Sequence, residues 1–221
     1  MARRAGFQIN REDIIRAAIK QISKYGFSNF TLSNLSKELN ITKAALYWHF
    51  KSKNDILMEV LKYIELEYIS KISEICDDKS LSASEKLKNY LTFVYEKSES
   101  DVHLCVIPSK LLGEFLHKDS EFHEEIREIY ANYKESIAKI LIDGIIEGDF
   151  KKNTSPIDHA RFIVGSIDGI LQQYISDHTQ VHKVFTTGEK FASNTKTLTS
   201  SLTPNNESNS DTFSLFKYSA S

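Results

Sequence analysis

The sequence contains few of the residues that make tight turns. Of its 221 residues, eight are glycine and three are proline. A β-rich fold needs frequent turns, and these two residue types supply much of the required backbone geometry, so we expect an all-α protein. No run approaches about 20 consecutive apolar residues, and no transmembrane helix is predicted. The basic residues 1–4 lack the apolar stretch of a secretion signal, so we expect a cytoplasmic protein.

The sequence also lacks the common catalytic and metal-binding motifs. It has no glycine-rich phosphate loop, no Gly-x-Ser-x-Gly elbow and no His-Glu-x-x-His. Cys76 and Cys105 are isolated, which fits free thiols in a reducing compartment. Two histidine–acid pairs within residues 117–123 fall on different faces of a helix, which disfavours a metal site. We therefore predict no enzyme activity, no cofactor and no metal.

Charge is distributed unevenly along the chain, although the net charge is only -2. Residues 1–54 hold 10 lysines and arginines against 3 acidic residues, whereas residues 55–221 hold 18 against 27. A basic N-terminal segment on an acidic remainder suggests that only the first segment meets a polyanion. Charge alone leaves an alternative open, in which the basic surface is merely solvated.

Capping residues and hydrophobic spacing predict three short helices in the basic segment. Asn10 can cap the first helix and Gly26 can end it. Thr31 can cap the second, and Asn40 tolerates the left-handed backbone of the turn that follows. Thr42 can cap a third helix that runs to about residue 50. Two short helices joined by a tight turn match the helix-turn-helix, whose second helix enters the major groove of DNA.

The third expected helix begins with Thr42, Lys43, Ala44 and Ala45. Threonine and lysine can hydrogen-bond bases or phosphates, and small alanines allow close approach to DNA. The whole string from residue 31 to 53, TLSNLSKELNITKAALYWHFKSK, resembles the signature of the TetR family of bacterial and archaeal regulators. Its most specific part is LYWHFKSK, residues 46–53. The resemblance covers about residues 8–68, which we take as the DNA-binding domain.

The resemblance implies a role for each residue that matches the motif. Backbone phosphates would be held by Thr31, Tyr47, His49 and Lys53, and bases would be faced by Thr42, Lys43 and Ala44. Trp48 would lie close to the DNA backbone. Phosphate contacts fix position, whereas base contacts give sequence choice. Two alternatives stay open, since Tyr47 could be simple core and Trp48 could be a packing aromatic.

Apolar periodicity predicts further helices, giving about nine in all. Residues 57–75 read as one long amphipathic helix, followed by a fifth that opens near residue 84. Pro108 suits the first turn of a sixth. A seventh carries an apolar stripe over residues 122–140 and ends at Gly148, and an eighth opens at Ser155 and runs to about residue 176. A weak ninth lies at residues 185–202, and residues 203–221 are predicted to be disordered.

The eighth expected helix is apolar on two sides, so it predicts a second buried contact. Gly165 and Gly169 are four residues apart and would let a partner helix cross closely, beside Leu171. We therefore expect a homodimer, since helix-turn-helix dimers read the two half-sites of a palindromic operator. The alternative is a central helix of a monomeric core.

The resemblance also implies a ligand-binding and dimerisation domain, residues 69–202, with a pocket inside each subunit. Candidate lining residues are aromatic: Tyr68, Tyr90, Phe93, Phe115, Phe122, Tyr130, Tyr133, Phe162 and Tyr174. Such a lining suits a small hydrophobic effector, although the same rings could simply fill the core. The sequence thus predicts a repressor released from its operator by ligand. The alternative is a DNA-binding protein without an inducer, acting through a protein partner or DNA architecture.

Overall fold

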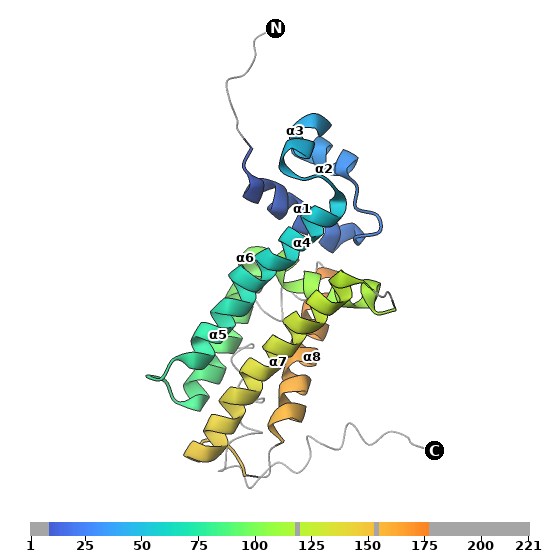
Figure 1. The fold of residues 1–221 in the computed structure, drawn as a ribbon. Helices are drawn as coiled ribbons and strands as arrows, with labels where there is room; N and C mark the ends of the chain where they lie inside the picture. The colour runs from blue at the N-terminus through green and yellow to red at the C-terminus, as the bar shows by residue number, and fades with distance from the viewer. Residues whose placement is uncertain (1–8, 118–119, 153–154, 177–221) are drawn as a thin grey trace, which may run out of the picture.

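The computed structural model describes residues 9–117, 120–152 and 155–176, and these residues are helical with no strands. The elements, labelled in Figure 1, are α1 (Arg11–Tyr25), α2 (Leu32–Glu38), α3 (Lys43–His49), α4 (Lys53–Ile64), the π-helical turn η1 (Glu65–Ile69), α5 (Ser70–Asp77), α6 (Ala83–Phe115), α7 (Glu121–Glu147) and α8 (Pro156–Ser176). The predicted all-α fold is confirmed. The predicted ninth helix and the segment 203–221 lie outside the described residues.

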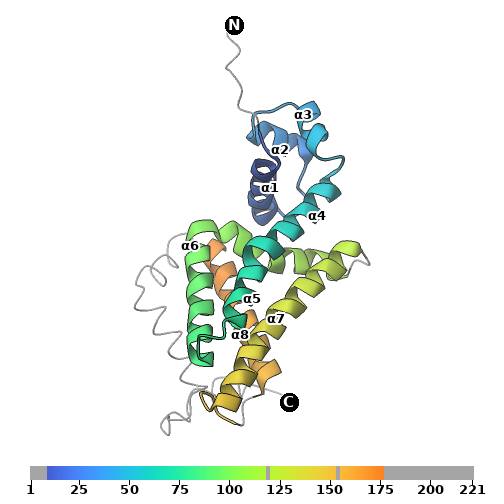
Figure 2. The ribbon, with the colours of Figure 1, turned by 60° about the vertical axis from the view of Figure 1, so that its left-hand side comes forward.

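The helices form a small head and a larger body. Helices α1 to α3 make up the head, and α4 runs from it into the body beside α6 and α7 (Figures 1 and 2). Helices α7 and α8 pack along one another, and α6 packs against both. One buried apolar core extends from Ile14 and Leu46 in the head to Leu141 and Leu171 in the body.

The head folds as local capping predicts. Asn10 and Asp13 form a capping box at α1, with bonds of 2.8 and 3.1 Å between each side chain and the other's backbone N–H. Asn40 has a φ of 53°, the left-handed value expected for the turn after α2. The N–H of Ile41 donates to Ser36 O at 3.0 Å, which together with Asn40 completes a Schellman motif. These hydrogen bonds to the last backbone carbonyls of α2 therefore fix the angle between α2 and α3.

The predicted long helix through residues 57–75 continues as α4, η1 and α5 with one irregularity. Leu57, Leu61, Ile64, Tyr68 and Ile72 are all buried, as their spacing predicts. The π-helical turn inserts a wider loop of backbone at residues 65–69, which the apolar spacing does not reveal.

The prediction that Pro108 opens the sixth helix is wrong. The chain bends instead at Asp101, where φ is -152° and ψ is 69°, and the Asp101 carboxylate accepts from Leu104 N–H at 3.2 Å. Asp101 therefore caps a second helical segment within α6, and Pro108 lies inside that segment. We call residues 83–100 the first arm and residues 102–115 the second arm of α6. Figure 2 shows the two arms meeting at a sharp bend.

The end of α7 falls where turn residues predict. Gly148 adopts a left-handed φ of 87° and ends α7. Phe150 then folds back, and its N–H donates to Gly144 O at 2.9 Å. A Cβ on Gly144 would lie 2.2 Å from the Phe150 ring, so only glycine fits at that position.

Candidate nucleic-acid interface and effector domain

The outer face of α3 presents the residues that the sequence predicts for DNA contact. Leu46 and Phe50 are buried and anchor the helix to the head. On the opposite face, 52% of Tyr47 and 81% of Trp48 are exposed, and this excludes the core alternatives for both aromatics. Thr42, Lys43 and Ala44 are also exposed, at the N-terminus of the helix. A large exposed aromatic pair beside a lysine is costly to leave in water and indicates a binding surface.

Thr31 and Thr42 each cap a helix and keep a hydrogen-bond donor. The Thr31 hydroxyl oxygen accepts from Asn34 N–H at 3.2 Å, and that of Thr42 accepts from Ala45 N–H at 3.1 Å. Neither bond uses the hydroxyl proton, so each hydroxyl can still donate to a phosphate oxygen. Capping therefore fixes both hydroxyls at the exposed starts of α2 and α3.

A surface groove of about 470 Å³ joins the starts of α2 and α4 to one side of α3. It brings together Thr31, Lys43, Tyr47 and Lys53 of the predicted DNA contacts. The remaining lining residues are Ser28, Phe30, Leu32, Ser33, Lys51 and Ser52. Ser33 was not expected from the sequence, because serine on a helix gives no local signal of phosphate contact. Three lysines and several hydroxyls make this groove suited to a phosphate backbone.

Lys53 already has partners within the head. Its Nζ lies 4.6 Å from the centre of the Phe27 ring and donates to Phe27 O at 3.5 Å. The ammonium group keeps two further protons, so it can bridge Phe27 and a phosphate.

The C-terminal end of α3 is tied to the rest of the head by Arg11. One guanidinium nitrogen donates to His49 O at 3.0 Å, and the other lies 3.4 Å from Glu59. The Trp48 and His49 rings meet edge to face, with centres 4.8 Å apart. His49 is half-buried, so part of its side chain stays accessible for the predicted phosphate contact.

The second arm of α6 holds the head through a junction that the sequence does not predict. The Glu114 carboxylate accepts from the N–H of Phe27 at 2.8 Å and from that of Ser28 at 2.6 Å. Lys110 donates to Ser23 O, and His103 Nδ1 lies 2.6 Å from Ser23 Oγ. The body is therefore hydrogen-bonded to the end of α1 and to the loop that leads to α2.

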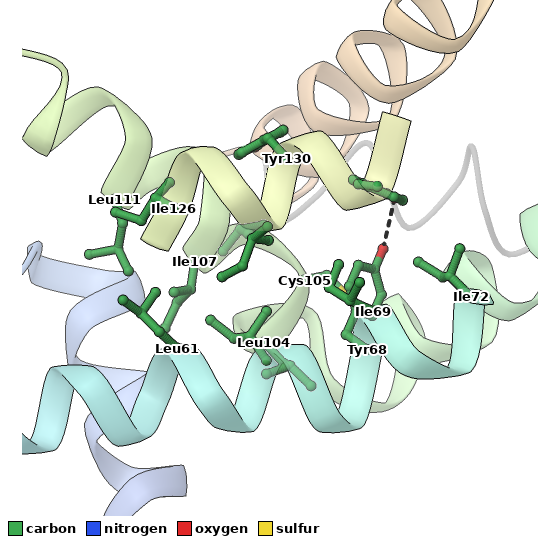
Figure 3. Close-up of a cluster of buried hydrophobic side chains, with 14 of the residues drawn as sticks. Leu61, Tyr68, Ile69, Ile72, Leu104, Cys105, Ile107, Leu111, Ile126 and Tyr130 are labelled. Carbon is green, nitrogen blue, oxygen red and sulfur yellow. Dashed lines mark hydrogen bonds between the residues drawn. The ribbon is translucent and has the colours of Figure 1, made fainter. Parts of the chain in front are cut away.

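The predicted ligand-lining aromatics separate into distinct groups. Tyr68, Tyr90 and Tyr133 share hydroxyl hydrogen bonds, with Tyr133 at 3.3 Å from Tyr68 and 2.8 Å from Tyr90 (the Tyr68 contact is drawn in Figure 3). Phe93 packs on Tyr68, with ring centres 5.7 Å apart. Burial raises the pKa of all three tyrosines, so they are neutral. We call Tyr68, Tyr90, Phe93 and Tyr133 the tyrosine cluster.

The other predicted aromatics lie elsewhere. Phe115 and Phe122 pack with Phe27 at the head–body junction, with ring centres 5.5–6.1 Å apart. Tyr130 donates to Asp168 rather than to the tyrosine cluster. Phe162 is 52% exposed on the outer face of α8, so its placement in an interior pocket is wrong for this conformation. The side chain of Tyr174 lies outside the described residues.

The predicted dimer residues also divide between two faces of α8. A Cβ added to Gly165 or Gly169 would meet nothing within 4 Å, so both glycines border open space. Leu171 is 4% exposed and packs in the core of its own subunit, which contradicts its assignment to an interface. Ile163, Val164 and Ile167 share that buried face.

Comparison with known proteins agrees with this geometry. The family model of the bacterial regulatory proteins of the tetR family matches residues 14–60, and that of the C-terminal region of YsiA-like proteins matches residues 64–190, over half of the chain. This chain belongs to the TetR family. It is accordingly a DNA-binding transcriptional regulator and not an enzyme.

Several relatives and solved structures are similar along most of the chain. The fatty acid metabolism regulator protein of Bacillus subtilis is 25% identical over 162 residues, which cover 73% of this chain and 81% of the relative. The structure of the regulator FadR from Bacillus subtilis in complex with stearoyl-CoA has a TM-score of 0.66 at 21% identity and covers 86% of this chain and 96% of that one. The ketosteroid regulator of Mycobacterium tuberculosis has a TM-score of 0.72 at 18% identity, covering 91% and 100%.

Two kinds of feature are missing from the described part of the chain. None of its helices is both long and apolar enough to cross a membrane. No group of three or more histidine, cysteine or acidic side chains there is arranged to hold a metal ion.

Proposed function

We propose that this regulator is a homodimeric repressor that binds a palindromic operator and leaves it when a small hydrophobic ligand binds the body. The observation that carries the proposal is the exposed face of α3, flanked by the lysine- and hydroxyl-lined groove. We assign residues 8–68 to DNA binding and residues 69–202 to ligand binding and dimerisation. An operator-bound protein of this kind acts in the cytoplasm of a bacterium or archaeon, at the nucleoid.

Within the head we assign base contacts to the start of α3 and phosphate contacts to the groove. Thr42 caps α3, and Lys43 and Ala44 lie in its first turn, where a recognition helix meets base edges. The phosphate contacts are assigned to Thr31, Tyr47, His49 and Lys53, with Trp48 near the DNA backbone. Lys51 and Ser33 are added because they line the same groove.

Dimerisation is assigned to the outer face of α8. Gly165 and Gly169 leave open space there, and Phe162 stands exposed beside them. An exposed aromatic next to a shallow strip of glycine backbone suits close packing of a second helix. A second copy would bring two α3 helices to successive turns of the operator.

The effector is assigned to the interior of the body, around the tyrosine cluster. Its rings pack on one another, and the three tyrosines are buried while Phe93 is half-buried, so a ligand must displace some of these rings before it can enter. That requirement couples ligand binding to a change in body shape, and a ligand controls DNA affinity only if it binds the two shapes unequally. The relatives solved or named with stearoyl-CoA, fatty acids and ketosteroids support an apolar effector.

The test is operator release. The operator is first isolated by selecting genomic fragments with the purified protein at about 150 mM salt, where non-specific binding is weakened. Fluorescence anisotropy of that operator is then followed while acyl chains and cationic amphiphiles are added. We expect one palindrome and a fall in affinity with at least one compound class. A palindrome whose affinity no compound changes would instead support a regulator that acts through a protein partner.

A further inference from the structure

Asp168 is a carboxylate that lies between three helices of the body. It belongs to α8, and its Oδ2 accepts a 2.7 Å hydrogen bond from the Tyr130 hydroxyl of α7. One turn further along α8, Gln172 donates to Ser109 on the second arm of α6 at 2.6 Å. No ion pair joins Asp168 to any lysine, arginine or histidine in residues 9–117, 120–152 and 155–176.

The surroundings of Asp168 disfavour its negative charge. Burial raises the pKa of Asp168 to about 6, and the bond from Tyr130 only partly opposes that shift. After the larger effect of burial, the Asp168 charge also helps to raise the pKa of Tyr130. At neutral pH the carboxylate is still mostly ionised. Asp168 is half-buried and its hydrogen-bond partner Tyr130 is neutral, so its charge is costly to keep and would be stabilised by a compensating group.

We propose that Asp168 anchors the polar end of the effector and selects an apolar ligand that carries a positively charged nitrogen. This inference rests on the proposed control of the head by a ligand in the body. A cation beside Asp168 would supply the missing countercharge, and tyrosine rings attract cations that lie against their faces. Ile107, Leu111 and Ile126 lie in the same part of the body as Tyr130 and are fully buried, so an apolar tail would contact them only after it displaces side chains that now cover them (Figure 3).

The same arrangement works against an anionic head group. A ligand carboxylate at Asp168 would place two negative charges in a site that already disfavours one. A hydroxyl head could accept or donate a hydrogen bond there, but it would leave the charge unbalanced. The site should therefore rank a cation first, a neutral alcohol second and an anion last.

Three ten-carbon probes that differ in their head groups test this ranking: decyltrimethylammonium, decanol and decanoate. Each is titrated into the full-length protein by calorimetry, below its critical micelle concentration, with wild type and D168N compared. We expect the wild type to bind decyltrimethylammonium at least about tenfold more tightly than decanoate, a difference of about 1.4 kcal/mol. D168N keeps the shape of the side chain without its charge and should lose that preference.

Asp158 provides the matched control, because it lies on the same helix but is exposed and pairs with Arg161 at 3.2 Å. D158N should keep the wild-type ranking of the probes. A preference for the cation that survives in D168N, or a wild type that binds all three probes equally or does not bind the cation, would overturn the role of Asp168. None of those results decides whether the protein is ligand-controlled, because operator release by other apolar compounds is measured separately.

Discussion

Removal of the Glu114 carboxylate should loosen the head from the body. Its two oxygens accept the N–H groups of Phe27 and Ser28 at 2.8 and 2.6 Å, and one also accepts the Ser28 hydroxyl. A hydrogen bond to a charged group contributes about 1.5–3 kcal/mol, and the Ser28 bond is exposed and lies below that range. We therefore expect E114A to lower the free energy of unfolding by about 2–3 kcal/mol. E114Q should lower the free energy of unfolding by at least half as much as E114A, because one amide oxygen cannot accept both N–H groups.

Two measurements check this prediction. Urea unfolding gives the change in stability, and native-state hydrogen exchange should show faster exchange of the Phe27 and Ser28 amides. Glu74 offers a matched control, since it pairs with Lys71 on the exposed surface of α5, and E74Q should change stability by less than about 0.5 kcal/mol. If E114A is as mild as E74Q, or the two amides keep their protection, the carboxylate does not hold the junction.

Three further predictions concern single positions. K53A should weaken binding to every DNA sequence and lower the slope of log affinity against log salt by about 1. K43A should instead change which operator base is preferred. Identical behaviour of the two variants in anisotropy titrations would contradict this division of roles. N40A should cost about 1 kcal/mol in urea unfolding because of the φ of 53°, and N40G should not. The raised pKa of Asp168 makes the folded state bind more protons between pH 4 and 6, so its burial lowers stability as pH rises through that range. In urea unfolding at pH 7.5, D168N should consequently have a higher free energy of unfolding than wild type, by on the order of 1–3 kcal/mol. This gain should shrink toward pH 4.

The head could be predicted from the sequence almost completely, because short-range bonds determine it. Asn10, Thr31 and Thr42 each satisfy a backbone N–H three residues further on, and such bonds depend on local spacing alone. The same holds for Asn40, whose side chain tolerates the left-handed turn. Once the helix ends are fixed, alternation of apolar and polar residues decides which face of α3 stays exposed.

The junction and the proposed effector site could not be predicted, because their contacts join residues that are distant in sequence. Glu114 meets Ser28 across 86 positions, and Tyr130 meets Asp168 across 38. Leu171 was assigned to the wrong face of α8 for a related reason. When a helix has two apolar faces, the sequence does not tell which face packs in the core of its own subunit. The break in α6 has a different cause: proline is compatible with a first helical turn but does not require one, whereas Asp101 adopts a non-helical backbone and caps the segment that contains Pro108.

The second arm of α6 links the proposed effector site to the head through one rigid segment. Ser109 contacts Gln172 beside Asp168, while Lys110 and Glu114, one turn apart, hold the head on the other side. The bend at Asp101 separates this arm from the first arm, so the second arm can shift without dragging the whole of α6. A ligand that displaces Gln172 or Tyr130 must therefore either move the arm, and with it residues 27 and 28, or break the bond to Ser109. Either route changes the hydrogen bonds between the body and the loop that carries Phe27. Lys53, an assigned phosphate contact, packs on the Phe27 ring.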